Sequence, residues 1–245
     1  MVHAALRGGV QQITCGVAAG WVNVNTERRM YVEIDSNSGF CFGVVRAITK
    51  AESALKEYGG EVFSLGDIVH NRMEVLRLEH LGLRTVTYAD MPSLSGRRLF
   101  IRAHGEPPST FRRAAELGIH VIDATCPVVA QLQSKVVAAH KRMDEVNGQV
   151  VILGKRGHAE VVGLTGQIDE PTIVVENEDD LQAIDFTRPV FFLSQTTQSV
   201  DLFWRLAEKM RERLGDERML TVDDTICRRV SNRERNLRSF ADAVA

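Results

Sequence analysis

The sequence has little that would hold a polyanion or a lipid bilayer. Its 30 lysine and arginine residues are offset by 32 aspartate and glutamate residues, so the formal net charge is −2. Without a basic excess, the chain has no general attraction for nucleic acid or for an anionic membrane surface. Its longest apolar runs, such as VVILG and PVFFL, are far shorter than the ~18 residues that a membrane-spanning helix needs. We therefore expect a globular protein that binds neither nucleic acid nor membrane.

The common local motifs for metals and phosphates are also missing. No C-x-x-C pair is present, which argues against zinc ribbons and thioredoxin-like redox centres. The Gly-rich Walker loop that cradles phosphates is absent as well. Any metal or phosphate must therefore be bound by residues far apart in the chain, chosen from four cysteines and seven histidines.

Short β-branched runs alternate with helical patterns from Tyr31 onward, which is typical of an α/β fold with mostly parallel sheets. The predicted strands are Val32–Ile34, Glu61–Leu65, Arg98–Arg102, His120–Ile122, Gln149–Leu153, Thr172–Val175, Val190–Leu193 and Met219–Val222. The predicted helices are Gly43–Tyr58, Arg72–His80, Ser109–Leu117, Pro127–Val146, Val200–Leu214 and Ser231–Ala241.

The first thirty residues lack this pattern. Their weakly apolar stretch is broken by Gly16 and Gly20 and has no continuous core of the kind that a secretory signal contains. We expect residues 1–30 to be a disordered extension or one that begins upstream of the true start. Cys15 lies in this extension and is given no role.

The other three cysteines share one context, because each follows a short strand and an aspartate and precedes a helix. These segments are VEIDSNSGFC, HVIDATC and LTVDDTIC, which end at Cys41, Cys126 and Cys227. The repetition predicts pseudo-repeated small α/β domains around a centre. The expected divisions are 31–42 for the first strand and cysteine, 43–125 and 126–222 for two α/β domains, and 223–245 for the start of a third.

Three separated cysteines leave several interpretations open. A free cysteine is most often a small buried hydrophobe. The start of a helix favours a thiolate, however, and three thiolates meeting at one point would bind an iron–sulfur cluster or zinc. A cluster with three protein ligands keeps one iron open for chemistry. The rival enzymatic interpretation is a Cys/His nucleophile that uses one of the three thiols and no metal.

Polar loops follow four of the predicted strands. Three of these loops carry His70, His104 and His158, and the fourth carries Gln195, Thr196 and Thr197. Ligands of α/β sheets bind at the carboxyl ends of strands, so we expect one shared pocket. Histidines beside a dianion become charged near neutral pH and could hold a diphosphate together with the hydroxyl and amide groups. Glu160 could supply a proton there.

Seven motifs together carry a family resemblance: SGFCFGVVRAI, LGDIVHNRMEVLRLEHLGL, IRAHGEPPSTFR, VIDATCPVV, GKRGHAEVVGLTGQ, SQTTQSV and DDTICRRVSNRE. In this order they resemble the 4-hydroxy-3-methylbut-2-enyl diphosphate reductases (the IspH/LytB family), over roughly residues 32–240. The resemblance implies a trefoil around one 4Fe-4S cluster that is held by Cys41, Cys126 and Cys227. It also implies diphosphate binding by His70, His104 and His158, proton donation by Glu160, and substrate positioning by Thr196 with Gln195 beside it.

The implied reaction is the last step of the methylerythritol phosphate route to isoprenoids. The allylic hydroxyl is lost with two electrons and two protons, which gives isopentenyl and dimethylallyl diphosphates. Ferredoxin or flavodoxin would supply the electrons in the cytoplasm. The family usually continues well past the third cysteine, whereas this sequence stops at Ala245. A truncated or degenerate homologue without activity is therefore the alternative.

Overall fold

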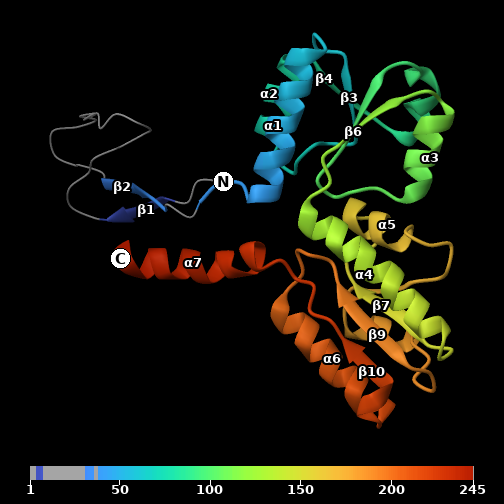
Figure 1. The fold of residues 1–245 in the computed structure, drawn as a ribbon. Helices are drawn as coiled ribbons and strands as arrows, with labels where there is room; N and C mark the ends of the chain where they lie inside the picture. The colour runs from blue at the N-terminus through green and yellow to red at the C-terminus, as the bar shows by residue number, and fades with distance from the viewer. Residues whose placement is uncertain (1–3, 8–30, 36–37, 245) are drawn as a thin grey trace. The chain divides into compact units, whose positions relative to one another are not determined.

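The computed structural model describes residues 4–7, 31–35 and 38–244 of the chain. These residues pack as two units, a larger one over 42–227 and a smaller one that joins 1–41 to 228–245. Each unit is described separately below. Figure 1 shows the helices and strands of both.

The larger unit contains two four-stranded parallel sheets with the same strand order. The first sheet has the order β4-β3-β5-β6 and the second the order β8-β7-β9-β10, so in each the first strand in sequence lies between the second and the third. The strands of the first sheet are β3 (Val62–Leu65), β4 (Leu83–Val86), β5 (Arg98–Ile101) and β6 (His120–Asp123). Those of the second are β7 (Gln149–Leu153), β8 (Ile173–Val175), β9 (Val190–Ser194) and β10 (Leu220–Val222).

Helices cover both faces of each sheet, as Figure 1 shows. The first sheet is flanked by α1 (Phe42–Glu57), α2 (Arg72–His80), the 3-10 helix η1 (Tyr88–Leu94) and α3 (Pro108–Glu116). The second is flanked by α4 (Pro127–Asp144), α5 (Ala159–Thr165), the 3-10 helix η2 (Glu178–Ala183) and α6 (Val200–Leu214). The short 3-10 helix η3 (Glu217–Met219) leads into β10.

The central strands are apolar on both faces because helices lie on both sides of them. In β7, Val150 and Ile152 pack with α4, whereas Val151 and Leu153 pack with α6. The stacked rings of Phe192 on β9 and Phe203 on α6, with centroids 4.6 Å apart, are fully buried in that second core. This packing fixes the carboxyl ends of the central strands, where the polar loops begin.

The smaller unit has an antiparallel pair of strands and one helix. Strand β1 (Ala4–Arg7) pairs with β2 (Tyr31–Ile34), and α7 (Arg228–Val244) lies against β1. The Arg233 guanidinium donates a hydrogen bond to the Gly39 carbonyl. The expectation of a structureless extension is thus wrong for Ala4–Arg7. The rest of that extension, with Cys15, lies outside the described residues.

The predicted α/β class with parallel sheets is confirmed, but β4, α5 and the three 3-10 helices of the larger unit were not foreseen. Strand β4 is a mostly exposed edge strand, and α5 has only seven residues, so neither has a clear periodicity. Helix α7 begins at Arg228 rather than at Ser231. The predicted boundary at 125/126 falls between the two sheets, but the division into three domains stays a prediction. Among the described residues, no helix combines the length and apolarity that a membrane span requires.

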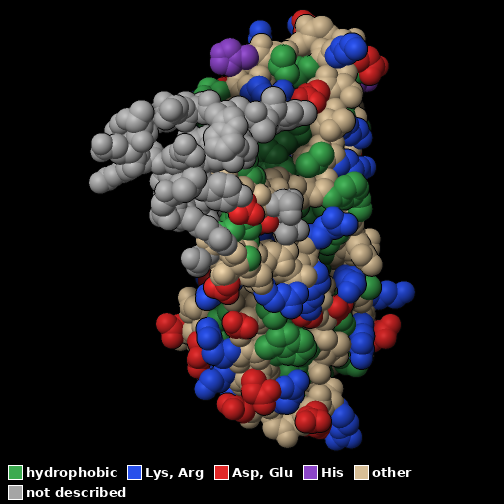
Figure 2. Space-filling model, turned by 90° about the vertical axis from the view of Figure 1, so that its left-hand side faces the viewer, with side chains coloured by type: hydrophobic (Ala, Val, Ile, Leu, Met, Phe, Trp, Pro, Cys, Tyr) green, Lys and Arg blue, Asp and Glu red, His purple; other side chains and the backbone are tan. Residues whose placement is uncertain are grey.

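Charged side chains of both signs alternate over the face shown in Figure 2. Among the described residues on that face, basic and acidic groups are mixed and do not form separate fields. This distribution fits the net charge of −2.

Candidate active site

The polar loops of the larger unit begin where each sheet reverses its direction of winding. β3 pairs with β5 and β7 pairs with β9, and the connections leave these pairs toward opposite edges of their sheets. Such switch points open a crevice at the carboxyl ends of the strands. His70 follows β3, His104 follows β5 and His158 follows β7. Both sheets therefore contribute side chains to one place.

His70, His104 and His158, called the histidine triad here, lie together as the sequence predicted. One ring nitrogen from each lies within 4.8 Å of those of the other two. Their ring centroids are 4.9, 5.2 and 5.5 Å apart. After His104 the chain turns at Gly105, whose φ of +71° favours glycine because a Cβ disfavours this conformation. A Cβ there would also meet the Gln133 amide at 2.6 Å.

The surroundings of His104 and His158 disfavour the protonated form of each ring. Burial lowers the pKa of His104 to about 3, and the Arg102 guanidinium and the other two rings contribute further. Burial also lowers the pKa of His158, with His70 and Arg102 adding to the effect. The Nδ1 atom of His104 is buried and has no hydrogen-bond partner among the described residues. At neutral pH these two rings are therefore uncharged, and one has a nitrogen available for a ligand.

His158 is held by hydrogen bonds to its Nδ1 atom. It caps the N-terminus of α5, where Nδ1 accepts from the Glu160 backbone N–H at 3.1 Å. The side-chain amide of Gln195 lies 3.2 Å from the same nitrogen. Gln195 is 2% exposed, and its Nε2 also donates to Thr197 Oγ1 at 2.9 Å. Its Oε1 accepts from the Lys155 N–H at 3.1 Å. The predicted contact of Gln195 with substrate stays a prediction.

Glu160 and Thr196 form a buried pair next to the triad. Glu160 is 2% exposed and Thr196 is 5% exposed. The carboxylate accepts from the Thr196 N–H at 2.7 Å and from its hydroxyl at 2.9 Å. Burial raises the pKa of Glu160, while the two hydrogen bonds from Thr196 oppose that shift. A carboxyl group in this setting can hold a proton at a higher pH than an exposed glutamate can.

Two of the three cysteines form backbone hydrogen bonds to residues of this crevice. The Cys126 N–H donates to the Ala103 carbonyl at 3.0 Å, next to His104, and the Cys227 N–H donates to the Thr196 carbonyl at 2.8 Å. Both thiols are half-buried and free of disulfides, and so is that of Cys41 in the smaller unit. Cys126 is the N-cap of α4, where the predicted first helical residue, Pro127, is confirmed.

A cavity of about 460 Å³ adjoins the triad and contains residues that the sequence analysis did not select. Its lining includes His70, Tyr88, Arg102, Glu106, Lys155 and His158. The Tyr88 hydroxyl donates to the Glu106 carboxylate, and burial together with that carboxylate raises the pKa of Tyr88 to about 12. Arg102 Nη2 lies 3.5 Å from Glu106 Oε1. Their positions in the sequence could have indicated Arg102 and Glu106, because each lies two residues from His104.

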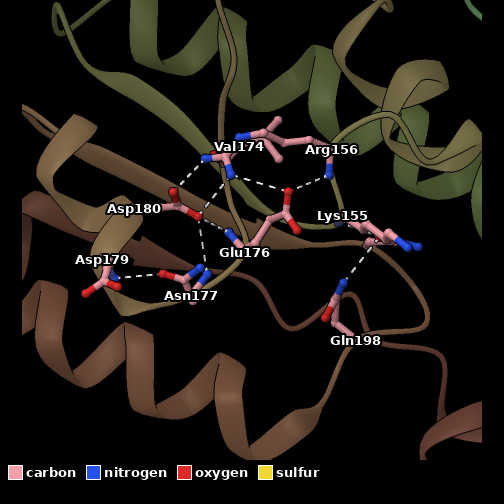
Figure 3. A network of polar contacts seen from close by, with 9 residues as sticks. Lys155, Arg156, Val174, Glu176, Asn177, Asp179, Asp180 and Gln198 are labelled. Carbon is pink, nitrogen blue, oxygen red and sulfur yellow. Dashed lines mark hydrogen bonds and ion pairs between the residues drawn. The ribbon is translucent and has the colours of Figure 1, made fainter.

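The loop before His158 is fixed to the edge of the second sheet by Arg156, as Figure 3 shows. The guanidinium donates to Glu176 Oε1 at 3.3 Å, to Asp180 Oδ2 at 3.1 Å and to the Val174 carbonyl at 2.7 Å. The Arg156 N–H also donates to Glu176 at 3.0 Å. These carboxylates satisfy the charge of Arg156. Among the described residues, the neighbouring Lys155 ammonium has no ion pair.

Comparison with known proteins assigns the chain to a family. The family model described as LytB protein matches residues 32–245. This chain belongs to the LytB family. Its sequence is 48% identical to that of the 4-hydroxy-3-methylbut-2-enyl diphosphate reductase of Porphyromonas gingivalis. The match covers 86% of this chain and 73% of the relative. It is 47% identical to the sequence of the reductase of the same name from Bacteroides fragilis, over 86% of this chain and 72% of the relative.

Solved structures agree with the family assignment. A structure of (E)-4-hydroxy-3-methyl-but-2-enyl diphosphate reductase, the terminal enzyme of the non-mevalonate pathway, matches with a TM-score of 0.72 at 32% identity. It covers 85% of this chain and 72% of that one. The E-1-hydroxy-2-methyl-but-2-enyl-4-diphosphate reductase of Plasmodium falciparum matches with a TM-score of 0.73 at 28% identity, over 84% and 63%. The LytB-family chain therefore shares the fold of these reductases.

Proposed function

We propose that this chain is a 4-hydroxy-3-methylbut-2-enyl diphosphate reductase. The substrate loses its allylic hydroxyl as water while it takes up two electrons and two protons, which gives isopentenyl or dimethylallyl diphosphate. The observation that carries the proposal is the juxtaposition of the histidine triad with the buried Glu160–Thr196 pair, in a chain that is 48% identical to a reductase of that name. One part suits a diphosphate, and the other suits proton delivery to a hydroxyl.

The triad is proposed to bind the diphosphate. Its imidazoles come from both sheets and lie close together, so the diphosphate would be bound without a Walker loop. An anion next to an imidazole favours its protonated form. Binding of the diphosphate should therefore draw a proton onto His104, which is neutral in the free protein. The unpaired Nδ1 of His104 is one place where such a proton could reside.

Glu160 is proposed to deliver a proton to the leaving hydroxyl. Its raised pKa allows it to be protonated at a pH closer to neutral, as a general acid requires. The Thr196 hydroxyl lies 2.9 Å from Glu160 Oε2. Because a hydroxyl can rotate, it can hydrogen-bond to the carboxyl group and to the substrate in turn. Burial of both side chains keeps bulk water away from this exchange.

One 4Fe-4S cluster held by Cys41, Cys126 and Cys227 is proposed as the redox cofactor. The local structure fits such a group at Cys126, because Gly43 leaves open the space against its sulfur: a Cβ on that residue would lie 2.6 Å from Sγ. The free state of all three thiols fits as well. A cluster with an open iron would supply electrons and a Lewis acid for the alcohol oxygen. Ferredoxin or flavodoxin is the proposed electron donor.

The test is anaerobic purification followed by metal analysis and an activity assay. We expect a brown protein with about four iron and four sulfide per chain. Reduced methyl viologen should then be oxidised only when 4-hydroxy-3-methylbut-2-enyl diphosphate is added, and mass spectrometry should detect both products. Cys126→Ser should lose iron and turnover, whereas Cys15→Ser should keep both.

The alternatives give different results in the same assay. A Cys/His nucleophile without a cluster would give a colourless protein that is inactivated by alkylation of a single thiol. An inactive homologue would give a brown protein that does not consume the substrate. Either result would refute the proposed reaction.

A further inference from the structure

The hydrogen bonds around His158 determine which of its ring nitrogens carries the proton. A backbone N–H can only donate, so Nδ1 must be the acceptor for the Glu160 N–H that lies 3.1 Å away. A neutral imidazole has one N–H and one lone pair. When Nδ1 uses its lone pair in this way, the proton must be on Nε2.

Gln195 strengthens this arrangement, and its own orientation is fixed. The Lys155 N–H donates to Oε1 at 3.1 Å, so the oxygen of the amide is identified by a group that can only donate. The NH₂ group of Gln195 is therefore the one that lies 3.2 Å from His158 Nδ1. Nδ1 then faces two N–H donors. A proton placed on Nδ1 would oppose both.

The consequence concerns what the triad can bind. A metal ion needs the lone pair of a ring nitrogen, and metal-bound histidines normally donate their other N–H to a carboxylate or carbonyl group. His158 has the reverse arrangement, with donors at Nδ1 and an N–H at Nε2. An N–H suits a phosphate oxygen and excludes a metal ion. The three histidines lie at distances that could otherwise serve a metal.

We propose that Gln195 is a positioning residue that, together with the Glu160 N–H, fixes His158 as an Nε2–H donor. The histidine triad is thereby selective for an oxyanion over a divalent metal ion. This inference rests on the proposed function for the identity of the oxyanion. Gln195 acts through His158 rather than by touching the substrate, because all the polar atoms of its amide already have protein partners. Its burial, at 2% exposed, keeps this geometry rigid.

The first experiment needs no substitution in the site. Long-range ¹H–¹⁵N spectra of the anaerobically purified full chain, labelled with ¹⁵N-histidine, report which nitrogen of each ring carries the proton. The His158 signals are assigned by their loss in His158→Asn. We expect Nε2 protonated and Nδ1 unprotonated in His158. An Nδ1–H tautomer, or rapid exchange between the two tautomers, would overturn the proposal.

The second experiment reverses the arrangement with Gln195→Glu. A carboxylate would accept a hydrogen bond from Nδ1 instead of donating to it, so only the Glu160 N–H would still oppose a proton on Nδ1, and Nε2 should become available to a metal. Calorimetry on the anaerobic holoprotein would use inorganic diphosphate and Zn²⁺ in separate titrations. We expect diphosphate affinity to fall by about tenfold or more, the effect of losing a hydrogen bond to a charged group. A Zn²⁺ site absent from the wild type should appear, and it should be lost again in Gln195→Glu/His70→Ala.

Gln198→Glu is the matched control. It adds the same charge to the same loop, but Gln198 contacts Oε1 of Gln195 and not His158. It should neither gain a Zn²⁺ site nor lose diphosphate affinity to the same degree. Unchanged ligand binding in Gln195→Glu, or equal effects in both variants, would refute the proposal. A fixed Nε2–H tautomer in a protein without turnover would instead refute only the proposed reaction, so the two failures are distinguishable.

Discussion

Both carboxylate oxygens of Glu160 accept hydrogen bonds from Thr196, one from its N–H at 2.7 Å and the other from its hydroxyl at 2.9 Å. The two residues are 36 positions apart, and each follows a central strand of the same sheet. Burial and hydrogen bonding thus act in opposite directions on the pKa of one carboxyl group. The group stays ionisable, and the Thr196 hydroxyl beside it can pass on its proton.

Glu160→Gln should retain the fold and the cluster but lose most turnover. The glutamine oxygen can accept from the Thr196 N–H and its NH₂ group can donate to the Thr196 hydroxyl, so the local geometry survives. The acidic proton is lost, which should lower kcat by roughly 10²–10⁴-fold. Anaerobic single-turnover kinetics with iron analysis would measure both effects. Glu170→Gln, at an exposed carboxylate, should behave as the wild type. Undiminished turnover in Glu160→Gln would remove the proton-donor role.

The stability of the protein should fall as the pH drops through the titration range of His104. Its pKa is about 3 in the folded protein, against an ordinary histidine value of 6.5 in the unfolded chain. Between these two values the unfolded chain therefore binds a proton that the folded chain does not. The free energy of unfolding then decreases with falling pH, by at most about 1.4 kcal/mol per pH unit from this group. Thermal unfolding at several pH values below 6.5 should show the slope.

His104→Asn is the variant that isolates this contribution. It should unfold with a shallower dependence on pH, because an amide does not titrate. His120→Asn changes an exposed histidine on the same sheet and should leave the slope as it is in the wild type. Equal slopes in all three proteins would show that burial of His104 does not govern acid stability.

The sequence predicted much of the fold and of the site because both follow local rules. Parallel strands of apolar residues end in polar loops, so strand position placed His70 and His104 at one edge of the first sheet and His158 at the same edge of the second. The contacts of Gln195 could not be predicted in this way. Its partners come from the Lys155 backbone and from a ring that is 37 positions away, and its role depends on which amide atom faces which donor. Arg102 and Glu106 were missed because no motif marks a buried ion pair.

Gly43→Ala should impair the Cys126 site. Gly43 lies in the first turn of α1, and a Cβ there would meet the Cys126 sulfur at 2.6 Å and its Cβ at 3.2 Å. Real Cβ atoms do not approach this closely, so the thiol or the helix must move. Iron content after anaerobic purification should fall well below that of the wild type. Thr49→Ala, at an exposed position of the same helix, should retain full iron content. Equal loading of both variants would show that the thiol can be displaced without cost to the site.

Lys155 and Arg156 are neighbours with equal charge, and the structure predicts different effects on stability when each becomes methionine. Arg156 is satisfied by Glu176 and Asp180 and anchors the loop that carries His158. Arg156→Met should therefore lower the unfolding temperature. The loss corresponds to about 1 kcal/mol of unfolding free energy, because both ion pairs involve a half-exposed side chain. The Lys155 ammonium has no ion pair among the described residues and lines the cavity beside the triad. Lys155→Met should leave the unfolding temperature unchanged.

The kinetic consequences separate the two residues further. A free cation at the cavity attracts a diphosphate, and this attraction weakens as salt screens it. Lys155→Met should raise KM several-fold at low ionic strength, and the difference from the wild type should shrink as salt is added. Loss of Arg156 instead disturbs the position of His158, so its increase in KM should persist at high salt. Because both variants remove one positive charge, each serves as the control for the other. Identical salt dependence in the two would mean that Lys155 and Arg156 act only through net charge.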